Sequence, residues 1–148
     1  MGPGPRREDG FTLLEVIVAL AILAFGLLAI ASMQATAIKG NSQAMGLTEG
    51  AAYAQDRMEK LMSLAYTHSD LNDTNGDGTA GLDLTVNGSG TVTADHSATD
   101  ATNTYTVYWN VAVNYPINNA KTIRMIVRWT DRGSRRSATF EFMKSDTI

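Results

Sequence analysis

An uninterrupted apolar segment near the N-terminus constrains this chain more than any other feature. From Val16 to Ile38 no residue carries a charge, a run of 23 residues. An α-helix rises about 1.5 Å per residue, so such a run would be about 35 Å long and would cross the hydrocarbon core of a bilayer. Arg6 and Arg7 lie shortly before the run, and Glu15 stands at its entrance. The pattern predicts a membrane-spanning helix with one acid at its start.

Three kinds of N-terminal segment share this pattern. A secretory signal would be cut after the apolar run, and Ala29-Ile30-Ala31 has the small-x-small pattern that signal peptidase prefers. A plain membrane anchor would keep the run and leave its basic flank in the cytoplasm. The third kind is a leader that is cut before the apolar run, so that the mature protein retains the run. Length and hydropathy alone leave all three open.

The residues at the start of the run favour the third kind of segment. The motif Gly10-Phe11-Thr12-Leu13-Leu14-Glu15 closely resembles the signature of the type IV pilin family, with a glycine before the cut, an aromatic new N-terminus and an acid four residues further on. The wider run to Gln34, which includes Gly26-Leu27-Leu28 and Met33-Gln34, is similar to minor pilins of the PilV group, the type IV pilus modification proteins. A pseudopilin of a type II secretion system shares this leader and helix, so it stays an alternative.

The resemblance implies a maturation pathway and a location. A prepilin peptidase would cut between Gly10 and Phe11 and methylate the amine of Phe11. Residues 11–38 would anchor the protein in the bacterial inner membrane, with the head in the periplasm, until other pilin subunits assemble with it into an extracellular pilus. There a minor pilin would prime assembly or modify the fibre that serves twitching motility and cell adhesion. The corresponding domains are a cleaved leader (1–10), the membrane and filament-core half of a helix (11–38), its amphipathic half (39–66) and a β-sheet head (67–148).

Two roles fit Glu15. The spacing Thr12-x-x-Glu15 matches a capping box, in which two side chains satisfy free backbone N–H groups at a helix start. The pilin resemblance implies the second role, an ion pair with the Phe11 amine of a neighbouring subunit in the filament. An acid carried to the bilayer centre costs about 2.5–3.5 kcal/mol, so a buried Glu15 needs such a partner. Capping would serve the single subunit and pairing would serve the filament, so both roles can hold together.

The residues after the apolar run predict that the helix continues to about Tyr66. Residues 39–66 carry an apolar stripe at helical spacing, formed by Leu47, Ala51, Ala54, Met58, Leu61 and Ala65. Such a stripe has to be covered, and a β-sheet is the expected cover. The expected weak points of this long helix are its glycines, Gly26, Gly40, Gly46 and Gly50, because glycine costs up to about 1 kcal/mol relative to alanine.

The C-terminal part of the chain predicts an antiparallel sheet. Apolar and polar residues alternate over 105–113, 123–129 and 138–142, which indicates three strands with one apolar face. Residues 84–93 predict a further short hairpin, and residues 94–103 predict a polar loop. The expected fold class is α+β and pilin-like, with a long N-terminal helix packed against an antiparallel sheet of about four strands.

One polar loop carries the start of a calcium-binding pattern. Asp73-x-Asn75-x-Asp77-Gly78 places oxygen ligands at alternate positions before a tight glycine turn, as in the first half of an EF-hand loop. Leu84 replaces the acid of the twelfth position, and Asp83 stands one place early. The candidate ligands for Ca²⁺ are Asp73, Asn75, Asp77, the Thr79 carbonyl and Asp83. The alternatives are a simple solvent-exposed turn or, for the whole chain, a calcium-binding exported domain released after Ala31.

Composition argues against several other functions. The chain has no cysteine, which excludes disulfides, thiol chemistry and cysteine–zinc sites. The net charge of −3 argues against a general nucleic-acid binder. The two histidines, His68 and His96, lie in polar stretches without metal-ligand spacing, and the sequence contains no nucleophile elbow or phosphate-binding motif. We therefore expect a structural subunit and not an enzyme.

Overall fold

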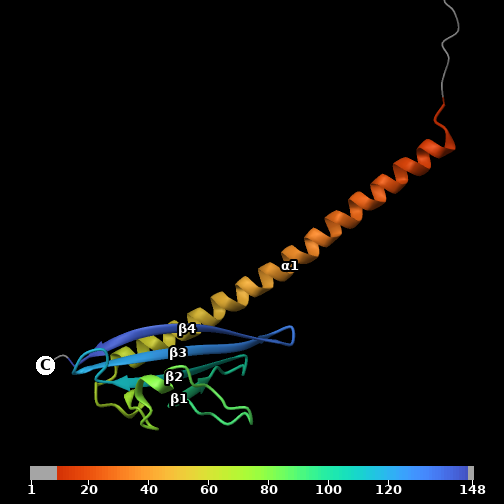
Figure 1. Cartoon of the computed structure of the whole chain (residues 1–148). Helices are drawn as coiled ribbons and strands as arrows, with labels where there is room; N and C mark the ends of the chain where they lie inside the picture. The colour runs from red at the N-terminus through yellow and green to blue at the C-terminus, as the bar shows by residue number, and fades with distance from the viewer. Residues whose placement is uncertain (1–9, 147–148) are drawn as a thin grey trace, which may run out of the picture. The chain divides into compact units, whose positions relative to one another are not determined.

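The computed structural model describes residues 10–146. In chain order it contains one long helix, two short 3₁₀ helices and four strands: α1 (Leu13–Ser63), η1 (Ser69–Leu71), η2 (Gly78–Gly81), β1 (His96–Thr99), β2 (Tyr105–Val113), β3 (Ala120–Asp131) and β4 (Ser134–Ser145) (Figure 1). The chain divides after Ser42 into two compact units. The long N-terminal helix and the four-stranded antiparallel sheet confirm the predicted α+β fold of the pilin-like type.

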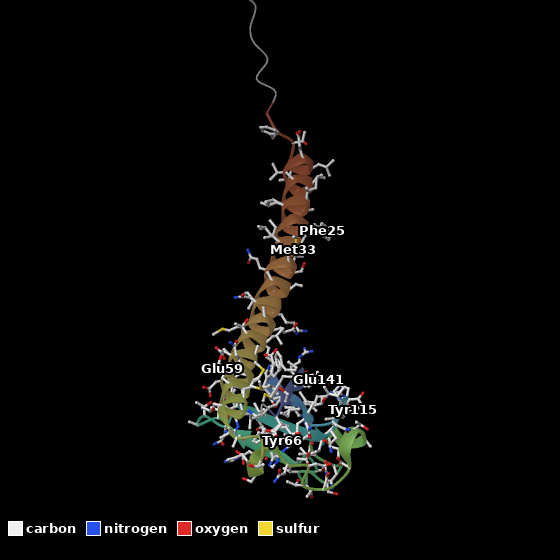
Figure 2. The ribbon with its side chains drawn as sticks, turned by 90° about the vertical axis from the view of Figure 1, so that its left-hand side faces the viewer. Phe25, Met33, Glu59, Tyr66, Tyr115 and Glu141 are labelled. Carbon is white, nitrogen blue, oxygen red and sulfur yellow. The ribbon has the colours of Figure 1, made fainter. Side chains whose placement is uncertain are left out.

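The N-terminal unit is built on the first part of α1, which is apolar on all sides. Its large side chains project outward and are exposed, Phe25 and Met33 among them (Figure 2). The two hydroxyl groups of the run bond within the helix, because Ser32 donates to the Ala29 carbonyl at 2.7 Å and Thr36 to the Ser32 carbonyl at 3.0 Å. Both can therefore enter apolar surroundings without losing a partner. The helix is long and apolar enough to cross a membrane, a criterion that a signal sequence also meets.

The second unit is built around the sheet, whose strands follow the order β1-β2-β3-β4 with every neighbouring pair antiparallel. The three strands expected from alternation are β2, β3 and β4, and the last two extend beyond the expected bounds. The β3–β4 hairpin turns at Arg132 and Gly133, whose φ angles of 48° and 78° are the left-handed values that a tight two-residue turn requires. The turn joins two strands of twelve residues each, so this hairpin is the longest part of the sheet.

The last part of α1 packs on one face of this sheet (Figure 1). Ala54 and Leu61, two members of the predicted apolar stripe, are buried against apolar side chains of β2 and β3, and Met58 is partly buried beside them. Leu47 and Ala65, the two ends of the stripe, are exposed. Since α1 ends at Ser63, the helix stops slightly before the predicted end, and Ala65 falls outside it.

The fourth strand lies where the sequence predicts a loop. Residues 84–93 form a single antiparallel bridge, Val86 with Val92, outside the sheet. The edge position beside β2 is taken by β1, which lies within the expected loop 94–103. The prediction of a loop over residues 94–103 was wrong because β1 is short and mostly polar, so no apolar run in the sequence indicates a strand there. Its support comes from β2, where the Trp109 ring stacks on His96 with 5.2 Å between centroids.

Gly46 and Gly50 allow α1 to approach the aromatic residues of the sheet closely. A Cβ atom at Gly46 would lie 2.9 Å from Nε1 of Trp129, and one at Gly50 would lie 3.3 Å from Cε1 of Tyr105. Tyr105 also donates its hydroxyl hydrogen to Glu49 at 2.8 Å. Burial and then this carboxylate raise the pKa of Tyr105 to about 12. Two expected weak points of the helix are therefore positions of close contact with the sheet.

The glycine contacts predict that alanine destabilises the fold at one position of the helix and not at another. In a soluble fragment that begins at Lys39, we expect Gly46→Ala to lower the free energy of unfolding by about 1–3 kcal/mol, because the added methyl group overlaps with the buried Trp129 ring. Gly40→Ala is the matched control, since no atom lies within 4 Å of its added Cβ. The control should leave the free energy of unfolding nearly unchanged, because Gly40 is the second residue of this fragment and the ends of helices fray. Urea unfolding followed by circular dichroism measures both, and a stabilised Gly46→Ala variant would contradict the close contact.

Candidate processing and assembly site

The residues of the predicted cleavage site lie at the exposed start of α1. Gly10 and Phe11 precede the helix, and the Phe11 side chain is 84% exposed. A Cβ atom at Gly10 would meet no atom within 4 Å, so the described part of the chain does not require a glycine there. A protease that needs close access to the backbone would explain this glycine. Met1–Asp9, the rest of the predicted leader, lie outside the described residues.

Thr12 caps the N-terminus of α1. Its Oγ1 accepts the backbone N–H of Glu15 at 3.3 Å, and its carbonyl accepts the N–H groups of Glu15 and Val16 at 3.1 and 3.3 Å. These bonds supply the Thr12 half of the predicted capping box. Within residues 10–146, no side chain or backbone group binds the Glu15 carboxylate, which is exposed. Capping therefore accounts for Thr12 and leaves the acid itself unexplained.

The Glu15 carboxylate is suited to bind a cation from outside its own subunit. The helix dipole places a partial positive charge at the N-terminus, which favours an acid in the first turn. At an exposed site that attraction is worth about 0.3–1 kcal/mol, less than the roughly 2.5–3.5 kcal/mol that an acid costs at the centre of an apolar layer. A positively charged group from a second chain would supply the difference.

A family model covers the same segment. The model described as the prokaryotic N-terminal methylation motif matches residues 5–31, which include Gly10, Phe11, Glu15 and much of the apolar run. The chain carries a prokaryotic N-terminal methylation motif. The resemblance of this segment to the type IV pilin signature is thereby confirmed. No curated protein and no solved structure gives a significant match to the chain.

The methylation motif has three general consequences. It points to a structural subunit of a filament and not to an enzyme. It implies processing by a prepilin peptidase and assembly with other pilin-like subunits. Together with the apolar helix, it is consistent with anchoring in a membrane. The individual roles of Gly10, Phe11 and Glu15 within the motif stay predictions.

The predicted calcium loop is a compact turn held by its own side chains. Asp73 accepts the backbone N–H groups of Gly76 at 2.7 Å and of Gly78 at 2.9 Å through its two carboxylate oxygens. Asn75 donates its side-chain N–H to Asp77 at 2.6 Å. The other oxygen of Asp77, Oδ1, is buried, and residues 10–146 offer it no hydrogen-bond partner. Asp73, Asn75 and Asp77 therefore lie together in one turn.

The other two candidate calcium ligands lie differently. Thr79 belongs to η2, directly after the turn. Asp83 binds Arg124 of β3 at 2.8 Å, and the same guanidinium binds Glu141 of β4 at 2.7 Å. Among the described residues, no group of three or more histidine, aspartate or glutamate side chains is arranged as a metal site. The turn thus offers the side chains of Asp73, Asn75 and Asp77, while the Asp83 carboxylate is bound to β3.

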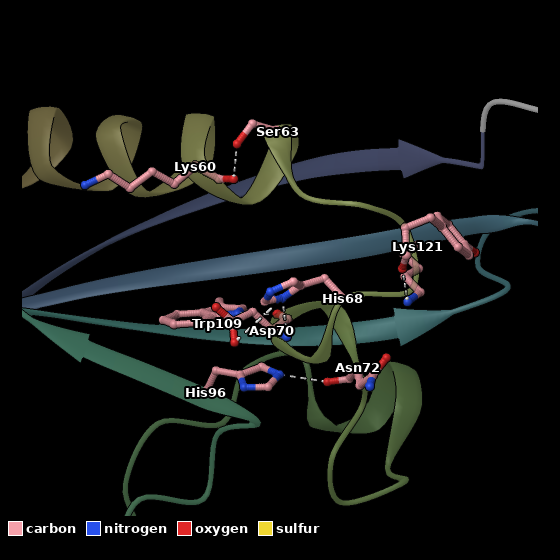
Figure 3. Close-up of polar contacts among 9 residues, drawn as sticks. Lys60, Ser63, His68, Asp70, Asn72, His96, Trp109 and Lys121 are labelled. Carbon is pink, nitrogen blue, oxygen red and sulfur yellow. Dashed lines mark hydrogen bonds and ion pairs between the residues drawn. The ribbon is translucent and has the colours of Figure 1, made fainter.

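Polar contacts that the sequence did not predict attach the segment after α1 to the sheet (Figure 3). Lys121 of β3 donates to the Tyr66 carbonyl at 2.8 Å, and burial lowers the pKa of its amine. Nε1 of Trp109 donates to the Asp70 carbonyl at 2.9 Å, and the His96 ring bonds another carbonyl of this segment at 2.9 Å. His96 is therefore a half-buried structural residue. The acceptors in these contacts are backbone carbonyls, which every residue has. The residue types in the sequence therefore do not indicate the contacts.

Proposed function

We propose that the chain is a minor pilin of a bacterial type IV pilus, of the PilV group. The proposal rests on one combination, the methylation motif with Glu15, which has no partner among the described residues, at the start of an exposed apolar helix. After cleavage between Gly10 and Phe11, that helix would hold the protein in the inner membrane with the head in the periplasm. Assembly would then move it into the extracellular fibre, where it would prime assembly or modify the pilus.

The exposed apolar helix supports a transfer from lipid to a bundle of like helices. Burying apolar surface is worth about 25 cal/mol per Å², so water is a poor environment for side chains such as Phe25, which is 74% exposed. Lipid would cover these side chains before assembly, and the helices of neighbouring subunits would cover them in the filament. Lipid tails and leucine side chains are similarly apolar, so apolar burial alone hardly favours the filament over the membrane. A polar interaction has to supply the specific attraction.

Glu15 and the mature N-terminus would form that polar interaction. Cleavage would leave a positively charged amine on Phe11, about one helical turn from the carboxylate of Glu15. The amine of one subunit and the carboxylate of the next would neutralise each other in surroundings where neither charge is stable alone. The pair would also set the axial offset between neighbouring helices, because only one offset brings the two charges together.

A pseudopilin of a type II secretion system is the alternative for the same motif. Both classes share the leader and the helix, so the pairing of Glu15 would be common to both. The similarity of the run up to Gln34 to minor pilins favours the pilus. Recovery of the protein in pili sheared from cells would indicate a minor pilin. Recovery only together with a secretion apparatus would indicate a pseudopilin.

The pairing model predicts that Glu15→Gln stops assembly without stopping processing. Glutamine also fits the third position of a capping box, so a purely capping role would leave the variant nearly unaffected. Removing one partner of a buried ion pair costs about 3–5 kcal/mol, which is enough to exclude a subunit from the filament. We expect the variant to be cleaved and membrane-bound, yet absent from sheared pili by immunoblot.

A matched control for this experiment is available on the same helix. Glu59 is an exposed acid in the second unit, where it accepts a hydrogen bond from Gln55 at 3.2 Å. Glu59→Gln makes the same chemical change outside the apolar run, and the variant should enter pili normally. Normal recovery of Glu15→Gln in purified filaments would refute the pairing model and leave helix capping as the role of this acid.

We further propose that the turn of residues 73–78 binds one Ca²⁺ ion. The buried Asp77 Oδ1 supports this proposal, because a buried carboxylate oxygen without a donor is costly and a cation would satisfy it. Asp73, Asn75, Asp77 and the Thr79 carbonyl would be the ligands. Asp83 would join them only by leaving Arg124, so it is the weakest candidate of the set.

The calcium proposal predicts a rise in thermal stability. A ligand that binds only the folded state at 100 times its Kd adds about 2.7 kcal/mol to the free energy of unfolding. We expect millimolar Ca²⁺, compared with a chelator, to raise the Tm of the soluble fragment from Lys39 by several degrees. Asp77→Ala should abolish the shift. Asp56→Ala, which removes only a surface ion pair with Lys60, should retain it. The absence of any shift in the unmutated fragment would leave a simple turn.

A further inference from the structure

A broad groove crosses the face of the sheet that α1 does not cover. Successive strand residues point to opposite faces, so Thr106, Tyr108, Ile126 and Arg128 face away from the core residues that alternate with them. Together with the segment 83–90 and the start of β4, they line a hollow of about 920 Å³. The hollow lies wholly within the second unit. Its volume is within the usual range of ligand-binding clefts, about 300–1,000 Å³.

The floor of the groove consists of two rows that run across three strands. In the first row Thr106 of β2 pairs with Arg128 of β3, which pairs with Ser137 of β4. The second row is formed in the same way by Tyr108, Ile126 and Thr139. Both rows therefore place hydroxyl groups toward the margins of the floor, on either side of β3. Side chains of one row stand about 5 Å apart, so a chain lying along the first row would meet a polar group at every strand, and one along the second row would meet a polar group on either side of Ile126.

Hydroxyl and amide groups dominate the lining. Seven of the lining side chains end in a hydroxyl group and two in a carboxamide. Such groups both donate and accept hydrogen bonds, which suits a ligand that itself carries many hydroxyl groups. The half-buried ring of Tyr108 adds a flat apolar surface with a polar tip, against which the face of a sugar ring can lie.

The arginines on this face of the sheet are not equivalent. Arg124, on the same face of β3, binds the carboxylates of Asp83 and Glu141, so its charge is compensated within the chain. Arg128 donates instead to a neutral acceptor, the hydroxyl of Thr85, at 3.2 Å. Arg135 lines the groove one row further along β4. The groove therefore presents guanidinium groups that can bind a carboxylate or sulfate through paired N–H groups.

We propose that this groove binds a segment of an acidic polysaccharide. Its sugar hydroxyls would bond to the hydroxyl and amide lining, and its carboxylate or sulfate groups would bind Arg128 and Arg135. This function is separate from assembly through the N-terminal helix, because every lining residue belongs to the second unit. In a surface fibre, such a site would attach the protein to the glycan coat of a cell or matrix.

A single-stranded nucleic acid is the competing polyanion, and the lining disfavours it. Nucleic-acid grooves rely on several aromatic rings on which successive bases stack. Here Tyr108 is the one aromatic ring among the outward-facing side chains of the described floor, since Trp129 is 8% exposed and belongs to the core.

The test is a calorimetric titration of the full chain in a neutral detergent without sugar headgroups. The probes are oligogalacturonate, which carries carboxylates, a heparin oligosaccharide, which carries sulfates, a neutral maltodextrin and oligo-dT. We expect at least one acidic oligosaccharide to bind about tenfold or more tightly than the maltodextrin, because hydrogen bonds to charged groups are the strongest available here. The probe that binds identifies the anion that the groove recognises.

Three variants assign the binding to the groove. Arg128→Gln and Arg135→Gln should each weaken binding about tenfold, and Ser137→Tyr should block it sterically without changing the charge. Arg136→Gln is the matched control: the neighbouring residue loses the same charge, but it does not line the groove. Circular dichroism and Tm confirm that each variant is folded. Equal loss in Arg136→Gln, equal affinity for maltodextrin, tighter binding of oligo-dT, or no binding of either acidic probe would overturn the proposal.

Discussion

The apolar side chains on the first part of α1 are not covered by other residues of their own unit, and this constraint determines which surroundings the helix requires. A helix whose residues from Val16 to Ile38 carry no charge is stable only where other apolar groups surround it. Lipid and the matching helices of other subunits are the two covers that a prokaryotic N-terminal methylation motif implies. Because both covers are apolar, we propose that the few polar groups at the helix start determine which of them surrounds the helix. Glu15 is the acid among them.

In the second unit, the rest of the same helix is covered by the sheet. There α1 meets a sheet through a narrow stripe, and Gly46 and Gly50 let two large aromatic rings come close to its backbone. The Tyr105–Glu49 hydrogen bond adds a polar contact at this surface. The segment that contains η2 covers part of the other face, where Asn110 of β2 donates to the Leu82 and Leu84 carbonyls. The rest of that face carries polar side chains. Its polar rows form the proposed groove, which requires no change in the core.

The parts of this structure that the sequence predicts are those encoded by local patterns. Residues 105–109 alternate between buried and half-buried because one of their faces lies in the core, which requires a period of two, and the motif Gly10 to Glu15 is contiguous and matches a family model. The strand β1 was missed because its support comes from Trp109 across the sheet and not from its own residues. The ion pair of Asp83 with Arg124 was missed for the same reason, since the folded sheet brings together residues far apart in the chain. The groove and the close contacts of Gly46 and Gly50 with the sheet likewise exist only after the strands have paired.

The identity of the mature N-terminus tests the central claim most directly, because the claim requires that the apolar helix is kept. The measurement is mass spectrometry of the N-terminal peptide from protein purified from membranes and from sheared fibres. The account predicts one start at Phe11, with a methyl group on its amine, in both fractions. A mature protein that begins at Ser32 would show that a signal peptidase removes the helix after Ala31. That result would contradict membrane anchoring, the role of Glu15 and assembly into a filament together.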